Sequence, residues 1–103
     1  MQKVEFLNLK KMHEAVRDDL HTALDEVLAG DSLILGQSLI QFEQQFASFC
    51  GADHFVGCAS GLDALILSLR ACGVGVGDEV IVPEHTFFAT WLAVSAVGAT
   101  IVP

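Results

Sequence analysis

Residues 54–72 read His-Phe-Val-Gly-Cys-Ala-Ser-Gly-Leu-Asp-Ala-Leu-Ile-Leu-Ser-Leu-Arg-Ala-Cys, and this stretch decides the fold. Its first part, 54–58, is a short apolar run typical of a buried strand. Small residues follow at 59–61. The next apolar residues recur at spacings of three and four, which predicts one face of a helix over 62–72: Leu62, Leu65, Ile66 and Leu69. The stretch therefore predicts a strand, a tight turn and a helix in succession.

The turn between that strand and that helix has the features of an anion-binding site. Ser60 can cap the helix, and Asp63 stands three residues further on, in the capping-box position. Gly61 lets another group approach the backbone closely. The free N–H groups at a helix start, together with the positive end of the helix dipole, bind anions and most often phosphates. An ordinary strand-to-helix turn would use the same residue types, so this segment alone leaves both interpretations open.

Downstream of residue 72 the same alternation repeats. The glycine-rich run 73–77 follows a helix and precedes a strand, so it is a helix C-cap and turn and not a dinucleotide-binding motif, which needs the reverse order. The segments that follow are a strand at 79–82, a loop at 83–86, a helix at 87–97 and a strand at 100–102. Residues 54–103 thus predict the order β-α-β-α-β, which is typical of a mostly parallel sheet flanked by helices.

In sheets of this α/β class, ligands bind beyond the carboxyl ends of the strands. Ser60 and Gly61 follow the first predicted strand, and the loop 83–87 follows the second. We therefore expect these two segments to lie on one rim of the sheet.

Residues 1–53, upstream of the deciding stretch, are expected to be mainly helical. The hydrophobic pattern predicts a helix over 11–29 that ends at Gly30. One stripe along this helix is apolar: Met12, Val16, Leu20, Leu24 and Leu28.

A second upstream helix is predicted to start with a capping box of Ser38 and Gln41, and to run through Cys50 to Gly51. Its apolar stripe is expected to be buried in a core: Leu39, Phe42, Phe46 and Phe49. The loop 32–36 before this helix is more apolar than a loop needs to be. That composition indicates packing against a neighbour or contact with a ligand.

The composition indicates a segment whose faces are covered by something else. Of 103 residues, 52% are hydrophobic and 17% are charged, whereas a free-standing domain of this size exposes much of its surface and carries more charge. A partner subunit or further chain would bury the excess. The net charge of −8 argues against non-specific binding to nucleic acid and against binding to anionic membranes, because both need a basic surface.

No side chain from Thr86 to Pro103 carries a formal charge, which raises the question of a membrane span. Polar residues within this stretch and the lack of a basic flank favour a buried helix, a glycine stop and a buried strand instead. The opening residues lack the apolar core of a signal peptide. Three scattered cysteines, Cys50, Cys58 and Cys72, predict buried free thiols and a reducing cytoplasm, and the histidines show no zinc-ligand spacing.

Five segments follow one another in a distinctive order and spacing: Phe6-Leu7-Asn8-Leu9, Ile34-Leu35-Gly36 with Phe42-Glu43, Gly61-Leu62-Asp63-Ala64-Leu65, Gly77-Asp78-Glu79-Val80-Ile81-Val82-Pro83, and His85-Thr86-Phe87-Phe88-Ala89-Thr90-Trp91-Leu92-Ala93-Val94. Together they resemble the DegT/DnrJ/EryC1/StrS family of sugar aminotransferases, over essentially the whole chain. The resemblance implies part of the large domain of a pyridoxal-5′-phosphate (PLP)-dependent transferase, fold type I and aspartate aminotransferase-like. The third and fifth segments are similar to the branch that acts on 3-keto sugar nucleotides.

The resemblance also implies roles for individual residues. The backbone amides of Leu62 and Asp63, in the turn formed with Ser60 and Gly61, would hold the PLP phosphate. Phe87 would stack on the pyridine ring, which orients a flat cofactor through apolar contact. Without the resemblance, Phe87 is better explained as a core residue. The family implies no firm role for His85, and it places the loop 32–36 near the nucleotide-sugar site or the dimer contact.

The activity implied is transfer of an amino group from an amino acid, with glutamate expected, to a nucleotide-linked keto sugar, by a cytoplasmic homodimer. The family's Schiff-base lysine and the aspartate at the pyridine nitrogen lie beyond the segments matched, and all the lysines here lie at or before the first helix: Lys3, Lys10 and Lys11. We therefore expect the chain to be a fragment without a catalytic residue or metal site of its own. A non-catalytic relative that binds PLP or a nucleotide sugar as a regulator, and an inactive truncated product, are the alternatives.

Overall fold

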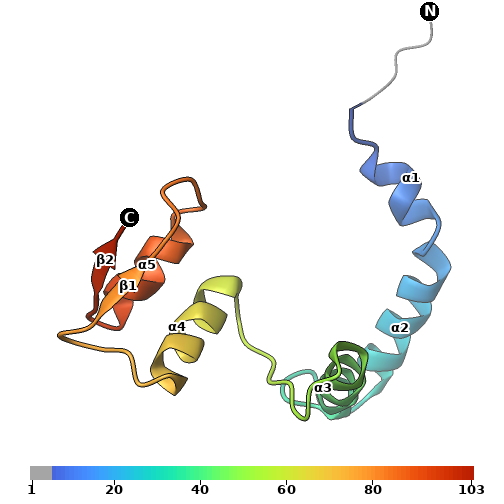
Figure 1. The fold of residues 1–103 in the computed structure, drawn as a ribbon. Coiled ribbons are helices and arrows are strands. Elements are labelled where there is room, and N and C mark those ends of the chain that lie inside the picture. The colour runs from blue at the N-terminus through green and yellow to red at the C-terminus, as the bar shows by residue number, and fades with distance from the viewer. Residues whose placement is uncertain (1–5) are drawn as a thin grey trace, which may run out of the picture. The chain divides into compact units, whose positions relative to one another are not determined.

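The computed structural model describes residues 6–103, so Lys3 and the rest of the opening segment lie outside the described residues. The elements follow the order α1, α2, α3, α4, β1, α5, β2 (Figure 1). The chain divides into two compact units, Met1–Phe55 and Val56–Pro103. The first unit holds α1 to α3, and the second holds the remaining helices and both strands.

The first unit begins with two short helices in place of one. Helix α1 spans Leu9–Glu14, and α2 spans Arg17–Ala29. The prediction of a single helix over 11–29 is therefore wrong. Val16 interrupts it, because its backbone angles, φ −120° and ψ 10°, are not helical. Its amide donates to the His13 carbonyl at 3.2 Å, a tight turn that ends α1. The break has a local reason, because acidic side chains directly after it, Asp18 and Asp19, stabilise the positive start of a new helix.

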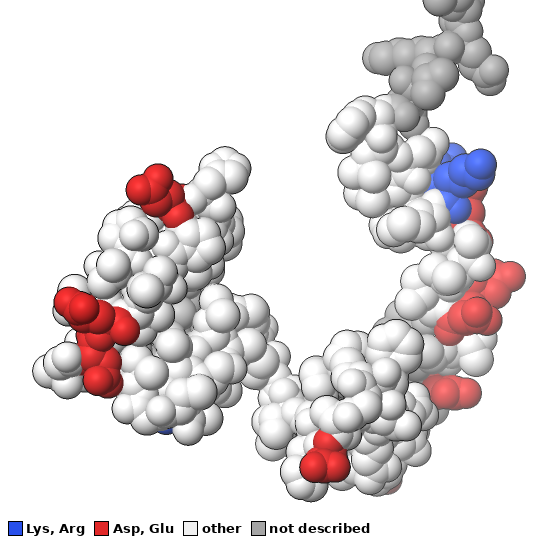
Figure 2. All heavy atoms as spheres, in the orientation of Figure 1, with Lys and Arg blue, Asp and Glu red and all other residues white. Residues whose placement is uncertain are grey.

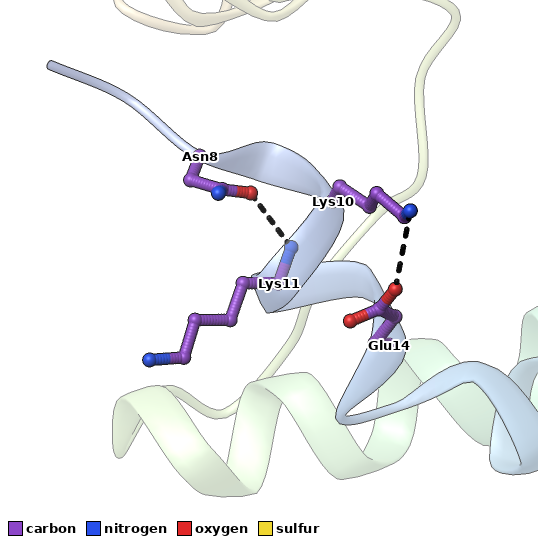
Figure 3. A network of polar contacts seen from close by, with 4 residues as sticks. All are labelled: Asn8, Lys10, Lys11 and Glu14. Carbon is purple, nitrogen blue, oxygen red and sulfur yellow. Dashed lines mark hydrogen bonds and ion pairs between the residues drawn. The ribbon is translucent and has the colours of Figure 1, made fainter. Parts of the chain in front are cut away.

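Helix α1 has its own cap and ion pair (Figure 3). The Asn8 side-chain oxygen accepts a hydrogen bond from the Lys11 amide at 2.9 Å, which satisfies one of the free donors at the helix start. One turn along, Lys10 Nζ lies 3.8 Å from Glu14 Oε1 on the exposed face of the helix. Both lysines of the described chain are therefore on α1.

Helix α3 spans Gln37–Cys50, and it starts at a glycine without a side-chain cap. The predicted capping box of Ser38 and Gln41 is wrong, because the helix begins at Gln37 and Ser38 already lies inside its first turn. Gly36 is required by space: a Cβ there would lie 2.5 Å from the Ser32 carbonyl oxygen. At the other end Gly51 adopts φ 66°, the left-handed conformation that closes a helix, and confirms the predicted stop.

Phenylalanines of α3 form a cluster with Phe55, and this cluster is only partly buried. The ring centroids of Phe46 and Phe55 lie 4.6 Å apart, and those of Phe42 and Phe55 lie 5.7 Å apart. The expected burial of the whole stripe is wrong, because Phe49 is 85% exposed and Phe42 is 49% exposed. In the described part of the first unit, Ala47 is the only buried residue. The stripe on α1 and α2 is exposed as well, because no described element covers it: Met12, Val16, Leu20, Leu24 and Leu28.

The second unit is a β-α-β unit with one more helix. Strands β1 (Glu79–Ile81) and β2 (Thr100–Val102) run parallel, with Val80 opposite Ile101. Helix α5 (Ala89–Ala96) connects them, and α4 (Gly61–Ala71) packs against α5. The core of this unit consists of three buried residues: Val82, Ala93 and Val94. The two parallel strands connected by α5 confirm that part of the predicted α/β pattern.

The strand predicted at 54–58 is not formed, so the sheet of the described residues has two strands. A strand needs a neighbour to pair its backbone N–H and C=O groups. Residues 54–58 lie across the boundary between the two units and pair with neither β1 nor β2. An apolar run alone does not show whether such a neighbour exists.

The glycine-rich run confirms its predicted role as a helix end and turn. Gly73 has φ 78° directly after α4, and Gly77 has φ 96° before β1. Asp78 fixes the turn, because its Oδ2 accepts a hydrogen bond from the Gly75 amide at 2.8 Å.

The charged residues are mainly acidic, 13 against 5 basic ones. Figure 2 shows acidic side chains over both units, while the main basic patch on that face lies at α1. The predicted burial of the three thiols is wrong: Cys50, Cys58 and Cys72 are free and exposed. Two of them lie at helix ends, with Cys50 closing α3 and Cys72 capping α4, where no described element covers them. Over residues 6–103, no helix combines the length and the apolar character that a membrane crossing requires.

Candidate functional site

The N-terminus of α4 is held by a reciprocal cap. Ser60 has extended geometry at φ −159° and ψ 166°, and its Oγ accepts a hydrogen bond from the Asp63 amide at 3.1 Å. The same hydroxyl donates to Asp63 Oδ2 at 2.7 Å. The Ser60 carbonyl accepts from the Ala64 amide at 3.0 Å, the first bond of the helix ladder. The cap predicted at Ser60 with Asp63 is therefore confirmed.

Two backbone donors remain open at this helix start. Within the described chain, the amides of Gly61 and Leu62 have no acceptor, whereas the Asp63 amide is used by Ser60. A Cβ built on Gly61 would meet nothing within 4 Å, so the backbone here can be approached closely. Adjacent N–H groups at the positive end of an eleven-residue helix are a donor set that suits a phosphate dianion. Of the two amides that the sequence suggested as donors, Leu62 is open, and Asp63 would have to leave its cap.

The loop between β1 and α5 presents an aromatic side chain. Phe87 is 72% exposed, so it does not fill the core of the unit. Its ring centroid lies 4.7 Å from that of Phe88, with the two planes at 57°. The loop begins at Pro83, directly after the sheet's last bond, from the Val82 amide to the Val102 carbonyl at 2.9 Å. The loop that carries Phe87 therefore follows the carboxyl end of β1, as predicted.

Side-chain hydrogen bonds tie this loop to α5, and the sequence reasoning missed them. The Trp91 indole Nε1 donates to the Pro83 carbonyl at 3.1 Å. The hydroxyls of Thr86 and Thr90 lie 3.0 Å apart and share a hydrogen bond. The spacing of four residues between the two threonines is a signal that could have been read. The partner of Trp91 lies eight residues earlier, and no local rule predicts it.

The sequence predicted that Ser60 and Gly61 lie on the same rim of the sheet as the loop 83–87, and this prediction is confirmed for the loop only. The loop follows the carboxyl end of β1, but Ser60 follows a segment that is not a strand. Ser60, Gly61, Leu62 and Asp63 lie at the start of α4, and Phe87 lies just before α5. Because α4 packs against α5 within one unit, both segments are positioned by the same pair of helices.

The apolar loop 32–36 lies in the first unit. Its side chains Leu33, Ile34 and Leu35 are exposed, and Leu35 adopts φ 53°, which is unusual for a residue with a side chain. The Ser32 hydroxyl donates to the Ile34 carbonyl at 3.0 Å and holds the loop closed.

Other chemistry-bearing groups belong to other elements of the chain. Lys10 and Lys11 are on α1, in the other unit from Ser60 and Phe87 (Figure 3). Over residues 6–103, no three His, Cys, Asp or Glu side chains gather as a metal site.

Solved structures define the class of this fold. The chain matches the crystal structure of DesV from S. venezuelae, described as a complex with a ketimine intermediate, with a TM-score of 0.90 and 51% identity over 100% of this chain and 28% of that one. It also matches NtdA from Bacillus subtilis with bound cofactor PMP, with a TM-score of 0.83 and 36% identity over 99% of this chain and 24% of that one. The fold is part of the α/β large domain of PLP-dependent transferases, as expected.

Sequence comparison gives the family. The sequence model of the DegT/DnrJ/EryC1/StrS aminotransferase family matches residues 14–103, and the chain belongs to this family. It is 52% identical over 101 residues to the dTDP-3-amino-3,4,6-trideoxy-alpha-D-glucose transaminase of Streptomyces venezuelae. That match covers 98% of this chain and 27% of the relative, so the chain spans about a quarter of the relative's length.

Proposed function

We propose that the protein to which this chain belongs is a PLP-dependent aminotransferase. It transfers an amino group from an amino acid, with glutamate expected, to a keto sugar linked to a nucleotide, and it acts as a homodimer in the cytoplasm. Family membership and the transaminase named above support this proposal. The observation in this chain that carries it is the pair of open amides at Gly61 and Leu62, at the start of a capped helix. Because the relative is a transaminase, the alternative of a non-catalytic regulator is not favoured.

In the proposed site, the residues of α4 bind the cofactor's phosphate. The amides of Gly61 and Leu62 donate to phosphate oxygens, and the helix dipole adds a favourable field. The Ser60 hydroxyl donates to Asp63 Oδ2 at 2.7 Å, so its role in the proposed site is to hold the cap. That bond also holds the Asp63 carboxylate in the cap. Ser60 and Asp63 thus shape the turn, and Gly61 and Leu62 supply the donors.

Phe87 orients the cofactor ring in the same proposal. The Phe87 ring is exposed, so it is free to stack on the pyridine ring, and such an apolar contact would exclude water from the stacked face. When bound, PLP serves as the electron sink for amino-group chemistry, while the protein positions it. We expect the lysine that bonds covalently to PLP to come from outside these 103 residues, because Lys3, Lys10 and Lys11 all precede every strand of the chain in sequence.

Titration of the complete gene product with PLP tests the proposal. We expect a visible absorption band of protein-bound PLP that differs from that of free PLP, and that changes when glutamate is added. An amino-transfer assay with glutamate and a dTDP-linked keto sugar then tests the substrate class. The absence of any bound-PLP band in the complete, folded product would contradict the proposal, and a band without transfer to the sugar would contradict only the substrate class.

A further inference from the structure

The loop that carries Phe87 is held from both ends by side chains of the following helix. At its start, the Trp91 Nε1 donates to the Pro83 carbonyl at 3.1 Å. Proline has no amide hydrogen, so this carbonyl is the only hydrogen-bonding group of the Pro83 backbone. Trp91 is half-buried, and its indole spans from the first turn of α5 back to the end of β1. The bond therefore closes the loop at its base.

A second set of bonds closes the loop around Phe87 itself. The hydroxyls of Thr86 and Thr90 lie 3.0 Å apart, on either side of Phe87 in sequence. The Thr90 amide donates to the Phe87 carbonyl at 3.1 Å. The backbone of Phe87 is thus fixed to α5 although its ring is exposed.

The part of α5 to which the loop is tied is the best-packed part of the described unit. Ala93 and Val94 are among its few buried residues, and the helix packs against α4. On the other side of the loop, the Val82 amide remains in the ladder with Val102. Trp91 and the two threonines therefore connect an exposed loop to a rigid base.

We propose that Trp91, Thr86 and Thr90 are positioning residues that hold the Phe87 ring ready for the cofactor. This inference rests on the proposed function, and none of the three needs to touch the cofactor. A ring that is already ordered costs less free energy to engage, because the loop does not have to be immobilised on binding. Removing either the bond from Trp91 to Pro83 or the bond between Thr86 and Thr90 makes the loop more mobile before PLP binds, and it weakens PLP binding.

The test uses Trp91→Phe and Thr86→Val in the complete gene product. The first keeps an aromatic ring but removes the N–H donor, and the second keeps the branched shape but removes the hydroxyl. Thr22→Val is the matched control, because Thr22 also uses its hydroxyl in a bond, to the Asp18 carbonyl at 3.0 Å on α2. Amide hydrogen exchange of residues 84–88 reports on the loop, and titration with PLP reports on binding.

We expect each of the two variants to speed exchange of the loop amides and to raise the Kd for PLP by roughly three- to tenfold, the worth of one net hydrogen bond. Exchange in α4 and β2 stays at the wild-type rate, and Thr22→Val leaves both readouts unchanged. Thr90→Val serves as a third variant with the same expected result, should Trp91→Phe fail to fold.

Three outcomes would overturn the proposal. The first is that amide exchange of the loop is unchanged in the variants. The second is that exchange becomes faster throughout α4 and β2 as well as in the loop. The third is that loop exchange becomes faster while the Kd for PLP stays the same. The second outcome would mean that the hydrogen bonds of Trp91, Thr86 and Thr90 stabilise the whole unit and do not act on the loop alone. If the wild-type protein bound no PLP, the proposed function would fail and the positioning role with it. Normal wild-type binding with unaffected variants would overturn the positioning role alone.

Discussion

At Leu62 the backbone matters more than the side chain. Its amide is one of two open donors at the start of α4, while Ser60 uses the Asp63 amide next to it. The residue type at such a position is therefore weakly informative about the site. The sequence does reveal the cap formed by Ser60 and Asp63, which leaves the amides of Gly61 and Leu62 without an acceptor in the described chain.

Leu62→Pro should weaken phosphate binding while the helix is kept. Proline removes the N–H but is tolerated in the first turn of a helix. A hydrogen bond to a charged group is worth about 1.5–3 kcal/mol, so we expect the Kd for PLP to rise roughly 10- to 150-fold in titrations of the complete gene product. Leu62→Ala, which keeps the N–H, is the control and should bind PLP as the wild type does. Equal affinities for the proline variant and the wild type would refute the donor role.

Phe87→Ala should weaken PLP binding without unfolding the protein. The ring is 72% exposed, so its loss opens no cavity in the core. An aromatic stacking contact is worth about 0.5–1.5 kcal/mol, which predicts a rise in Kd of roughly two- to tenfold. Phe49→Ala removes a ring of the same size, 85% exposed, from α3, and we expect it to leave the Kd unchanged. An unchanged Kd in Phe87→Ala would show that the ring does not stack on PLP.

Among the elements, the turn between α2 and α3 depends on one glycine for space. Gly36 has φ −83°, so an alanine there would suffer no backbone penalty, but its Cβ would lie 2.5 Å from the Ser32 carbonyl oxygen. Gly30, at the other end of the same turn, has φ −82° and a nearest atom at an ordinary 3.4 Å. The two glycines have almost the same φ angle, and they differ in the free space available to a Cβ.

Gly36→Ala should therefore lower the free energy of unfolding by about 1–3 kcal/mol, the cost of forcing an extra methyl group into filled space. Gly30→Ala should change it little, or raise it by about 0.4–1 kcal/mol through reduced freedom of the unfolded chain. Urea unfolding followed by circular dichroism measures both. Equal midpoints for the two variants would mean that the turn relaxes to admit the methyl group.

Elements with a local signature could be predicted from the sequence, and elements that depend on distant partners could not. Ser60 caps α4 and Gly51 ends α3 as expected, because caps and glycine stops act over a few residues. The strand at 54–58 fails because pairing needs a neighbour. Likewise, the open amides of the candidate site follow from its local cap, whereas the bond from Trp91 to Pro83 depends on how the loop folds back.

At the scale of the whole molecule, apolar surface outweighs core. Only Ala47, Val82, Ala93 and Val94 are buried hydrophobic residues within the described chain. Large exposed side chains line α2 and the loop 32–36, and they occur on α3 as well. Contiguous apolar surface of this kind normally lies against another part of a protein. The composition predicted this imbalance, since more than half of the residues are hydrophobic.

Residues 1–103 expressed alone should therefore self-associate. We expect sedimentation velocity to show concentration-dependent oligomers, and the dye ANS to fluoresce on binding the exposed surface. Leu20→Glu with Leu24→Glu places charges on the α2 stripe and should reduce both signals. A monomer with a cooperative thermal transition and no ANS binding would contradict this expectation.

The bond between Trp91 and Pro83 has one more consequence, because Trp91 is the sole tryptophan of these 103 residues. Indole emission responds to hydrogen bonding at the ring nitrogen and to nearby absorbing groups. The chain therefore carries an intrinsic optical reporter at the base of the Phe87 loop. Its fluorescence should shift when the loop opens and be quenched when an absorbing ligand arrives, without any added label.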